Sequence, residues 1–160
     1  MSVDIATPEA DSSTGGLTRD AALQDGQRFV LVERESGKIL MAIGHEALLQ
    51  ACDDMSALHS IWHWHWDCAI EGGWVTLRNR VTKKYLGSDS CGGYLIVASR
   101  SMTFTGHLVV TRSSGGGQTL SAPYAKGIKL VHDAGRNVSA KLKLGTTKGL
   151  EWEFVRLESQ

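Results

Sequence analysis

The sequence predicts an all-β fold, and three observations lead to this prediction. Only two prolines occur, Pro8 and Pro123, and no long segment shows the 3.6-residue period of an amphipathic helix. Glycine clusters at 72–73, 92–93 and 115–117 separate apolar runs of strand length. The third observation is an internal repeat, which sets the number and order of the strands.

The repeat is carried by pairs of leucines that frame a strand, a polar tip and a second strand. The pairs are Leu31 with Leu40, Leu77 with Leu86, and Leu120 with Leu130, and the tips are 35–38, 81–84 and 124–127. A third strand is expected at 47–52, 94–99 and 138–144, although 47–52 also fits a short helix. A fourth strand is expected at 61–68, 107–112 and 152–157, which aligns Trp62 with Leu108 and Trp64 with Trp152.

Three units of about 43–46 residues with four strands each give about twelve strands. A propeller needs four or more blades of this size, so three units do not close one. A threefold barrel capped by hairpins does close, and the prediction is therefore a β-trefoil. Residues 26–160 are expected to form this single domain, with repeats at roughly 27–72, 73–117 and 118–158.

Residues 1–25 differ in composition from the rest of the chain. They are rich in Ser, Thr, Gly, Asp and Ala and contain no aromatic residue, so we expect a disordered tail. This segment has no basic start followed by an apolar run, and no stretch of the chain is long and apolar enough to span a membrane. With three cysteines, an odd number, these features predict a cytoplasmic protein with free thiols and no membrane partner.

The stretch 61–68 combines tryptophan and histidine at a period of two. As a half-buried strand it would place Trp62, Trp64, Trp66 and Cys68 on one face and His63, His65 and Asp67 on the other. The tryptophans and Cys68 are expected in the core. Trp62 lies nearest the strand start and is the best candidate to stack on a ligand.

The pair His63 and His65 could ligate a metal ion, because alternate strand positions bring two imidazoles to one face. Only His107 and His132 could complete such a site, and neither has a supporting spacing. The sequence therefore predicts no metal and no other cofactor.

Several motifs resemble a known family. They are Trp66-x-Cys68, the run Gly73-Trp-Val-x-Leu-Arg-Asn-x-Val-x-x-Lys-Tyr-Leu-Gly-x-Asp89, and Trp152-Glu-Phe-Val155. Together they resemble the fascin-like and ricin-B-like β-trefoil proteins common in fungi, over residues 27–157. The resemblance implies the fold. The Gln-x-Trp signature of ricin-B sugar-binding lobes is absent at 63–65, 106–108 and 151–153, so a galactose-type site is not implied.

Seventeen basic and seventeen acidic residues leave no net charge, which argues against specific nucleic-acid binding. Within this balance, residues 126–148 are basic and could form a weak anion-binding surface. The leading functional hypothesis is a non-catalytic module, monomeric or weakly dimeric, that binds a small molecule, glycan or protein through Trp62, His63, His65 and Asp67. The alternative is a cofactor-independent enzyme, a cyclase or isomerase acting on a small metabolite, in which His63 and His65 would be catalytic.

Overall fold

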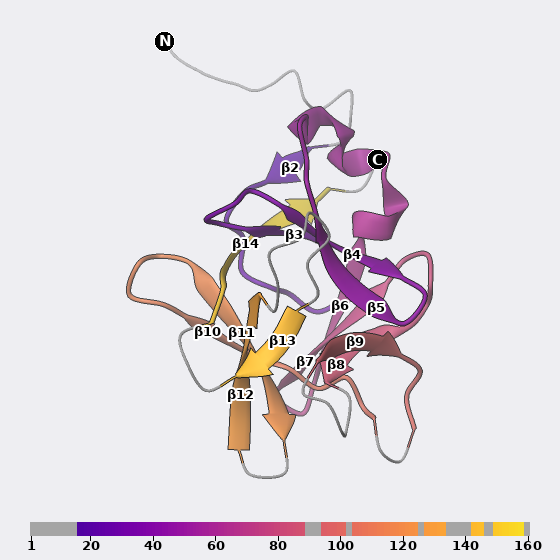
Figure 1. Ribbon diagram of the computed structural model, residues 1–160. Coiled ribbons are helices and arrows are strands. Elements are labelled where there is room, and N and C mark those ends of the chain that lie inside the picture. Colours follow the sequence, from indigo (N-terminus) through magenta and orange to yellow (C-terminus); the bar gives the residue numbers. More distant parts are fainter. Residues whose placement is uncertain are drawn as a thin grey trace.

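The computed structural model describes residues 16–88, 94–101, 104–124, 127–133, 142–145 and 149–158 (Figure 1). The strands are β2 (Leu17–Thr18), β3 (Arg28–Glu33), β4 (Ile39–Ile43), β5 (Glu46–Gln50), β6 (Trp66–Glu71), β7 (Trp74–Asn79), β8 (Tyr85–Ser88), β9 (Leu95–Ala98), β10 (Val109–Arg112), β11 (Gln118–Tyr124), β12 (Gly127–Asp133), β13 (Leu142–Gly145) and β14 (Glu151–Leu157). Two 3₁₀ turns, η2 (Met55–His59) and η3 (Trp62–Trp64), lie between β5 and β6.

Six of these strands close into a barrel. The antiparallel pairs are β3 with β6, β6 with β7, β10 with β11, β11 with β14, and β14 with β3. A bridge between Val75 and Leu108, with hydrogen bonds in both directions, joins β7 to the segment leading into β10. The barrel therefore closes on itself, which leaves no exposed edge among these six strands.

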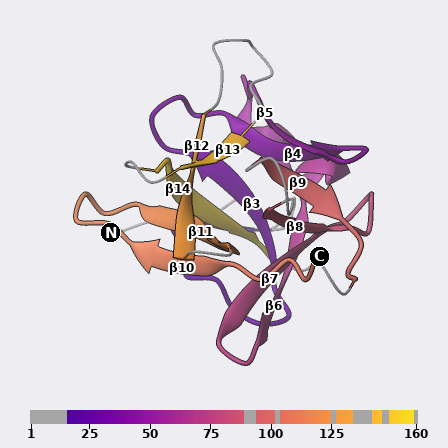
Figure 2. The same cartoon turned by 60° about the horizontal axis from the view of Figure 1, so that its bottom comes forward.

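Three hairpins cap the barrel: β4 with β5, β8 with β9, and β12 with β13. Their inner strands β5, β9 and β13 contact one another, as expected around a threefold axis (Figure 2). The predicted β-trefoil is thus confirmed. The segment that also fitted a helix is the strand β5, because it pairs with β4 along its whole length.

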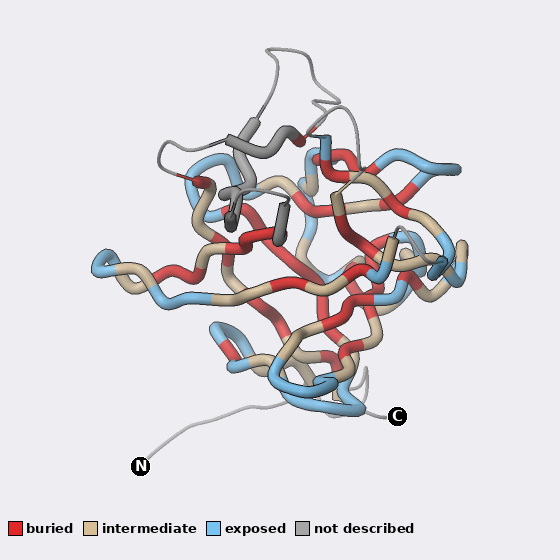
Figure 3. The backbone as a smooth tube through the Cα atoms, turned by 90° about the horizontal axis from the view of Figure 1, so that it is seen from below, coloured by how far each residue is buried: buried red, intermediate tan, exposed pale blue. Residues whose placement is uncertain are grey.

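The main core fills the barrel and the cap. Its buried members include repeated leucines at matching places in the first two units, Leu31 with Leu77 and Leu40 with Leu86, all without exposed surface. Trp66, Phe29, Trp152 and Phe154 complete the centre. In Figure 3 the buried positions run through the middle of the molecule and the exposed ones concentrate at the turns.

The strand β3 is buried on both faces, which explains its nearly continuous apolar sequence. Phe29 and Leu31 point into the main core, whereas Val30 and Val32 belong to a second cluster on the outside of the barrel. The 3₁₀ turns supply Leu58 and Trp64 to this second cluster. The insertion between β5 and β6 therefore covers the outer face of β3 and of its neighbour β14.

The expected strand 61–68 is wrong in its first half. Residues 62–64 form the turn η3, and the strand begins at Trp66. Cys68 pairs with Leu77 in β6–β7, as Val110 pairs with Leu120 in β10–β11. Trp66 rather than Trp62 therefore corresponds to Leu108, because the 3₁₀ insertion lengthens the first repeat.

The other expected strands are found, with small shifts at their ends: 94–99 is β9, 107–112 is β10 from residue 109, and 152–157 is β14 from residue 151. Of 138–144, the part from Leu142 onward is β13 and the remainder lies outside the described residues. The side chains of the basic stretch 126–148, apart from that of Leu142, also lie outside the described residues.

The boundary expected at residue 26 is too late. Strand β2 pairs with β14, the Ala21 amide donates to the Phe154 carbonyl at 2.8 Å, and Arg19 forms an ion pair with Glu153 at 2.7 Å. Composition suggested a tail, but Leu17 and Leu23 pack against the two clusters. Residues 1–15, which were also expected to be disordered, lie outside the described residues.

A chain that begins at Asp25 should therefore be less stable than the full chain. Removing the partly buried Leu17 and Leu23 and the pairing of β2 should cost about 2 kcal/mol or more, since burying one leucine contributes about 1.5–3 kcal/mol. Urea titration measures the loss. The ion pair between Arg19 and Glu153 alone should contribute little to stability. Arg19→Ala is therefore the control and should cost less than about 1 kcal/mol. Equal stability of the shortened and full chains would contradict this account.

Candidate functional site

The turn η2 has polar side chains at both ends, whereas η3 is closed by backbone hydrogen bonds alone. Asp54 precedes η2, and its carboxylate accepts from the Ser56 amide at 2.9 Å. At the other end the Ser60 hydroxyl donates to the Ala57 carbonyl at 3.0 Å. The His65 amide then donates to the Trp62 carbonyl, which closes η3 immediately before β6 begins. These turns and β2 lie at the opposite end of the barrel from the β12–β13 hairpin in Figure 1.

This local winding separates the residues that the period-two pattern placed together. Trp62 is 52% exposed, whereas Trp64 is 3% and His65 is 1% exposed. His63 is exposed, and its Nδ1 lies 3.3 Å from the Ala42 carbonyl, on the side of β4. The expectation that His63, His65 and Asp67 share one strand face is wrong, because residues 62–64 do not have the pleat of a strand.

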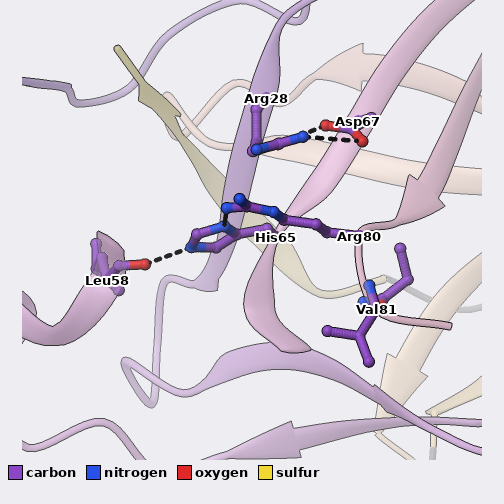
Figure 4. A network of polar contacts seen from close by, with 7 residues as sticks. Arg28, Leu58, His65, Asp67, Arg80 and Val81 are labelled. Atoms are coloured by element: carbon purple, nitrogen blue, oxygen red, sulfur yellow. Dashed lines mark hydrogen bonds and ion pairs between the residues drawn. The ribbon is translucent and has the colours of Figure 1, made fainter. Parts of the chain in front are cut away.

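His65 is held by hydrogen bonds at both ring nitrogens (Figure 4). Its Nε2 lies 2.6 Å from the Leu58 carbonyl oxygen, and its Nδ1 lies 3.0 Å from Nη1 of Arg80. A carbonyl only accepts and a guanidinium only donates. The arrangement therefore fixes a neutral imidazole that donates from Nε2 and accepts at Nδ1.

Arg80 is fixed by the neighbours of its guanidinium group. That group lies 3.5 Å from the centre of a Trp62 ring, a close cation–π contact. The backbone amide of Arg80 donates to the His65 carbonyl at 2.9 Å. Sequence reasoning missed Arg80, but a signal existed: in the β6–β7 hairpin Trp66 pairs with Asn79, so Arg80 follows directly opposite His65.

Asp67, from β6, pairs with Arg28 on β3. Arg28 donates through Nε to Oδ1 at 2.6 Å and through Nη2 to Oδ2 at 3.3 Å, a side-on bidentate contact. The two residues face each other directly in the β3–β6 register. This pairing joins strands far apart in sequence, and no local pattern predicts it.

These side chains line a pocket of about 400 Å³. Its lining residues are Gly26, Gln27, Arg28, His59, Trp62, His65, Asp67, Arg80, Leu157 and Glu158. Three of the four predicted ligand-binding residues, Trp62, His65 and Asp67, are thus brought together, and His63 is not among them. Sequence reasoning missed the lining contributed by β3 and by the C-terminal end of β14.

Two further groups bear on the chemistry of this region. Burial raises the pKa of the Cys68 thiol to about 12, so this core cysteine is an inert thiol, as expected. Within the described ranges, no three His, Cys, Asp or Glu side chains are placed to hold a metal ion. The free thiols in those ranges are Cys52 and Cys68. Cys91 and the side chain of His132 lie outside them.

The comparisons with known proteins identify the fold. No protein-family profile matches the chain, and no curated protein matches it by sequence. Among solved structures, the ricin B-like lectin of Macrolepiota procera in complex with lactose aligns with a TM-score of 0.65 at 15% identity, covering 87% of this chain and 100% of that one. The lectin of Polyporus squamosus, bound to the human-type influenza-binding epitope Neu5Acα2-6Galβ1-4GlcNAc, aligns with a TM-score of 0.61 at 10% identity, covering 83% of this chain and 50% of that one.

A third structure, the β-trefoil of BEL, aligns with a TM-score of 0.62 at 8% identity and covers 86% of this chain and 97% of that one. At such identities the likeness concerns the fold alone, which is the β-trefoil. In the described part of the chain, no helix has the length and apolar character needed to cross a membrane.

The burial of the His65 imidazole should make the stability of the fold depend on pH. Burial lowers the pKa of His65, and the nearby Arg80 and Arg28 lower it further, against the opposing effect of the Leu58 carbonyl. The unfolded chain, with an ordinary histidine pKa of about 6.5, therefore binds this proton first as pH falls. The contribution of His65 is fully present above about pH 6.5 and is lost below it, at up to about 1.4 kcal/mol per pH unit.

Urea titrations between pH 8 and pH 5 test this dependence. His65→Gln, whose amide can also donate and accept, should show a flatter decline in unfolding free energy than the wild type. His63→Gln, an exposed neighbour, is the control and should keep the wild-type slope. A wild-type slope in His65→Gln would contradict this account, because it would mean that the folded and unfolded chains bind the His65 proton equally well.

Proposed function

We propose that the protein is a non-catalytic binding module that holds a polar, sugar-sized molecule in the pocket beside Trp62. The observation that carries the proposal is a half-exposed indole beside polar groups that are already fixed by other contacts. A volume of about 400 Å³ falls within the range of about 300–1,000 Å³ that is usual for ligand sites. Groups fixed before binding lose little freedom when a ligand arrives.

The hydrogen bonding of His65 favours binding over catalysis. A histidine that acts as a general base needs a ring nitrogen that is free to accept a proton from the substrate. Both nitrogens of this imidazole are already engaged in hydrogen bonds inside the fold. His63 lies outside the pocket lining, so the two histidines cannot act on one substrate there. The cyclase or isomerase alternative, which needs this pair, is for these reasons the weaker candidate.

The structural neighbours support a glycan as the ligand class. One was solved with lactose and another with a sialylated trisaccharide, on the same fold. This chain lacks the Gln-x-Trp signature, so its sugar contacts would come from the insertion between β5 and β6 instead. The proposal includes a monomeric or weakly dimeric protein in a reducing, cytoplasmic setting, which the free thiols Cys52 and Cys68 support.

Trp62→Ala tests the site. Because its side chain is half exposed, the substitution should leave the melting temperature within a few degrees but abolish binding, since an aromatic anchor often contributes about 2 kcal/mol or more. A glycan array identifies binders, and titration calorimetry measures their affinity.

Trp74→Ala is the matched control. Trp74 is a partly exposed tryptophan that stacks on His107 at 5.4 Å, outside the pocket lining, and its removal should preserve binding. Binding that survives Trp62→Ala and fails in Trp74→Ala would move the site to the second repeat.

A further inference from the structure

We infer that the ligand of this pocket carries a carboxylate, as in an acidic sugar, and that Arg80 binds it. The inference rests on the proposed function and specifies its ligand. Arg28 is neutralised by Asp67, and Glu158 by Arg156, whose Nε lies 3.0 Å from Oε2. Arg80 forms no ion pair with any carboxylate in the part of the chain that the structure describes.

The contacts that hold Arg80 are all with neutral groups. The face of its guanidinium lies on Trp62, and one of its five N–H groups donates to the neutral His65 ring. Stacking occupies the face and leaves the edge of the plane, which is where a guanidinium donates its hydrogen bonds. The positive charge is thus positioned without being neutralised.

Arg28 strengthens this preference. Figure 4 shows its guanidinium beside that of Arg80, with Asp67 on the far side of Arg28. Burial lowers the pKa of the Arg80 guanidinium, the positive charge of Arg28 lowers it further, and Asp67 opposes these effects only in part. An anion bound at the edge of Arg80 would relieve this repulsion. Glu158 is paired with Arg156, which lies outside the lining, so among the described residues the charge of Arg80 is the one left uncompensated at the pocket. A singly charged carboxylate matches this single charge better than a doubly charged phosphate.

Matched sugar pairs test the inference by titration calorimetry at low salt. The probes are the methyl glycosides of glucuronic and galacturonic acid against those of glucose and galactose, which differ in the carboxylate, with inorganic phosphate and sodium acetate as free anions. We expect at least one acidic sugar to bind ten times or more tightly than its neutral partner. The difference should shrink as salt rises, because screening weakens charge contacts.

Variants assign the effect to Arg80. Arg80→Gln keeps a donor for His65 and should reduce the ratio between acidic and neutral sugars to about one, whereas Arg80→Lys should keep part of it. Arg112→Gln is the control: Arg112 is exposed and donates to the Gly116 carbonyl outside the pocket lining. Thermal melts confirm that each variant is folded.

Each outcome decides the matter. Equal binding of acidic and neutral sugars, lost in Trp62→Ala, would overturn the carboxylate inference and leave the proposed function standing. Phosphate or acetate binding as tightly as the acidic sugars would show a simple anion site and overturn the sugar part. Absence of binding by every probe would overturn the carboxylate inference, while the glycan array decides the proposed function separately.

Discussion

The closed barrel is the constraint on which the rest of the structure depends. Strand β14 pairs with β3 over six residue pairs, so the last described strand completes the sheet begun near the start of the domain. Closure removes exposed strand edges and encloses one core shared by all three repeats. It also makes β3 and β14 the strands whose outer faces must be covered. Val30 and Val155 have no exposed surface, although they face away from the barrel interior.

Covering that outer face produces the asymmetry on which the candidate site is built. The insertion between β5 and β6 supplies Leu58 and Trp64 as a cover, and the same turns position the Leu58 carbonyl toward His65. The imidazole then accepts from Arg80, and Trp62 lies against the guanidinium. One insertion thus both covers the outer face of the barrel and supplies residues of the polar pocket. The first repeat departs from threefold symmetry at the place where the polar groups converge, as functional sites commonly do.

The fold could be predicted because its determinants are periodic and local. Leucine pairs at a nearly constant spacing and glycine-marked turns indicate the repeat directly. The stretch 61–68 was misinterpreted because alternating Trp and His satisfy a strand pattern, while the turn η3 is closed by backbone hydrogen bonds that the pattern of side chains does not reveal. The pairing of Arg28 with Asp67 depends on barrel closure, so no local reasoning finds it. Arg80 was within reach of prediction, since the β6–β7 hairpin register places it opposite His65.

The central claim is that a neutral His65, donating to Leu58 and accepting from Arg80, holds the pocket ready for its ligand. Two-dimensional NMR that correlates the ring nitrogens of ¹⁵N-labelled histidine with their carbon-bound protons reports the tautomer directly. At pH 7 the account predicts a protonated Nε2 and an unprotonated Nδ1 for His65. A His65 ring that carries its proton on Nδ1, or on both nitrogens, would contradict it, because Arg80 would then have no acceptor there.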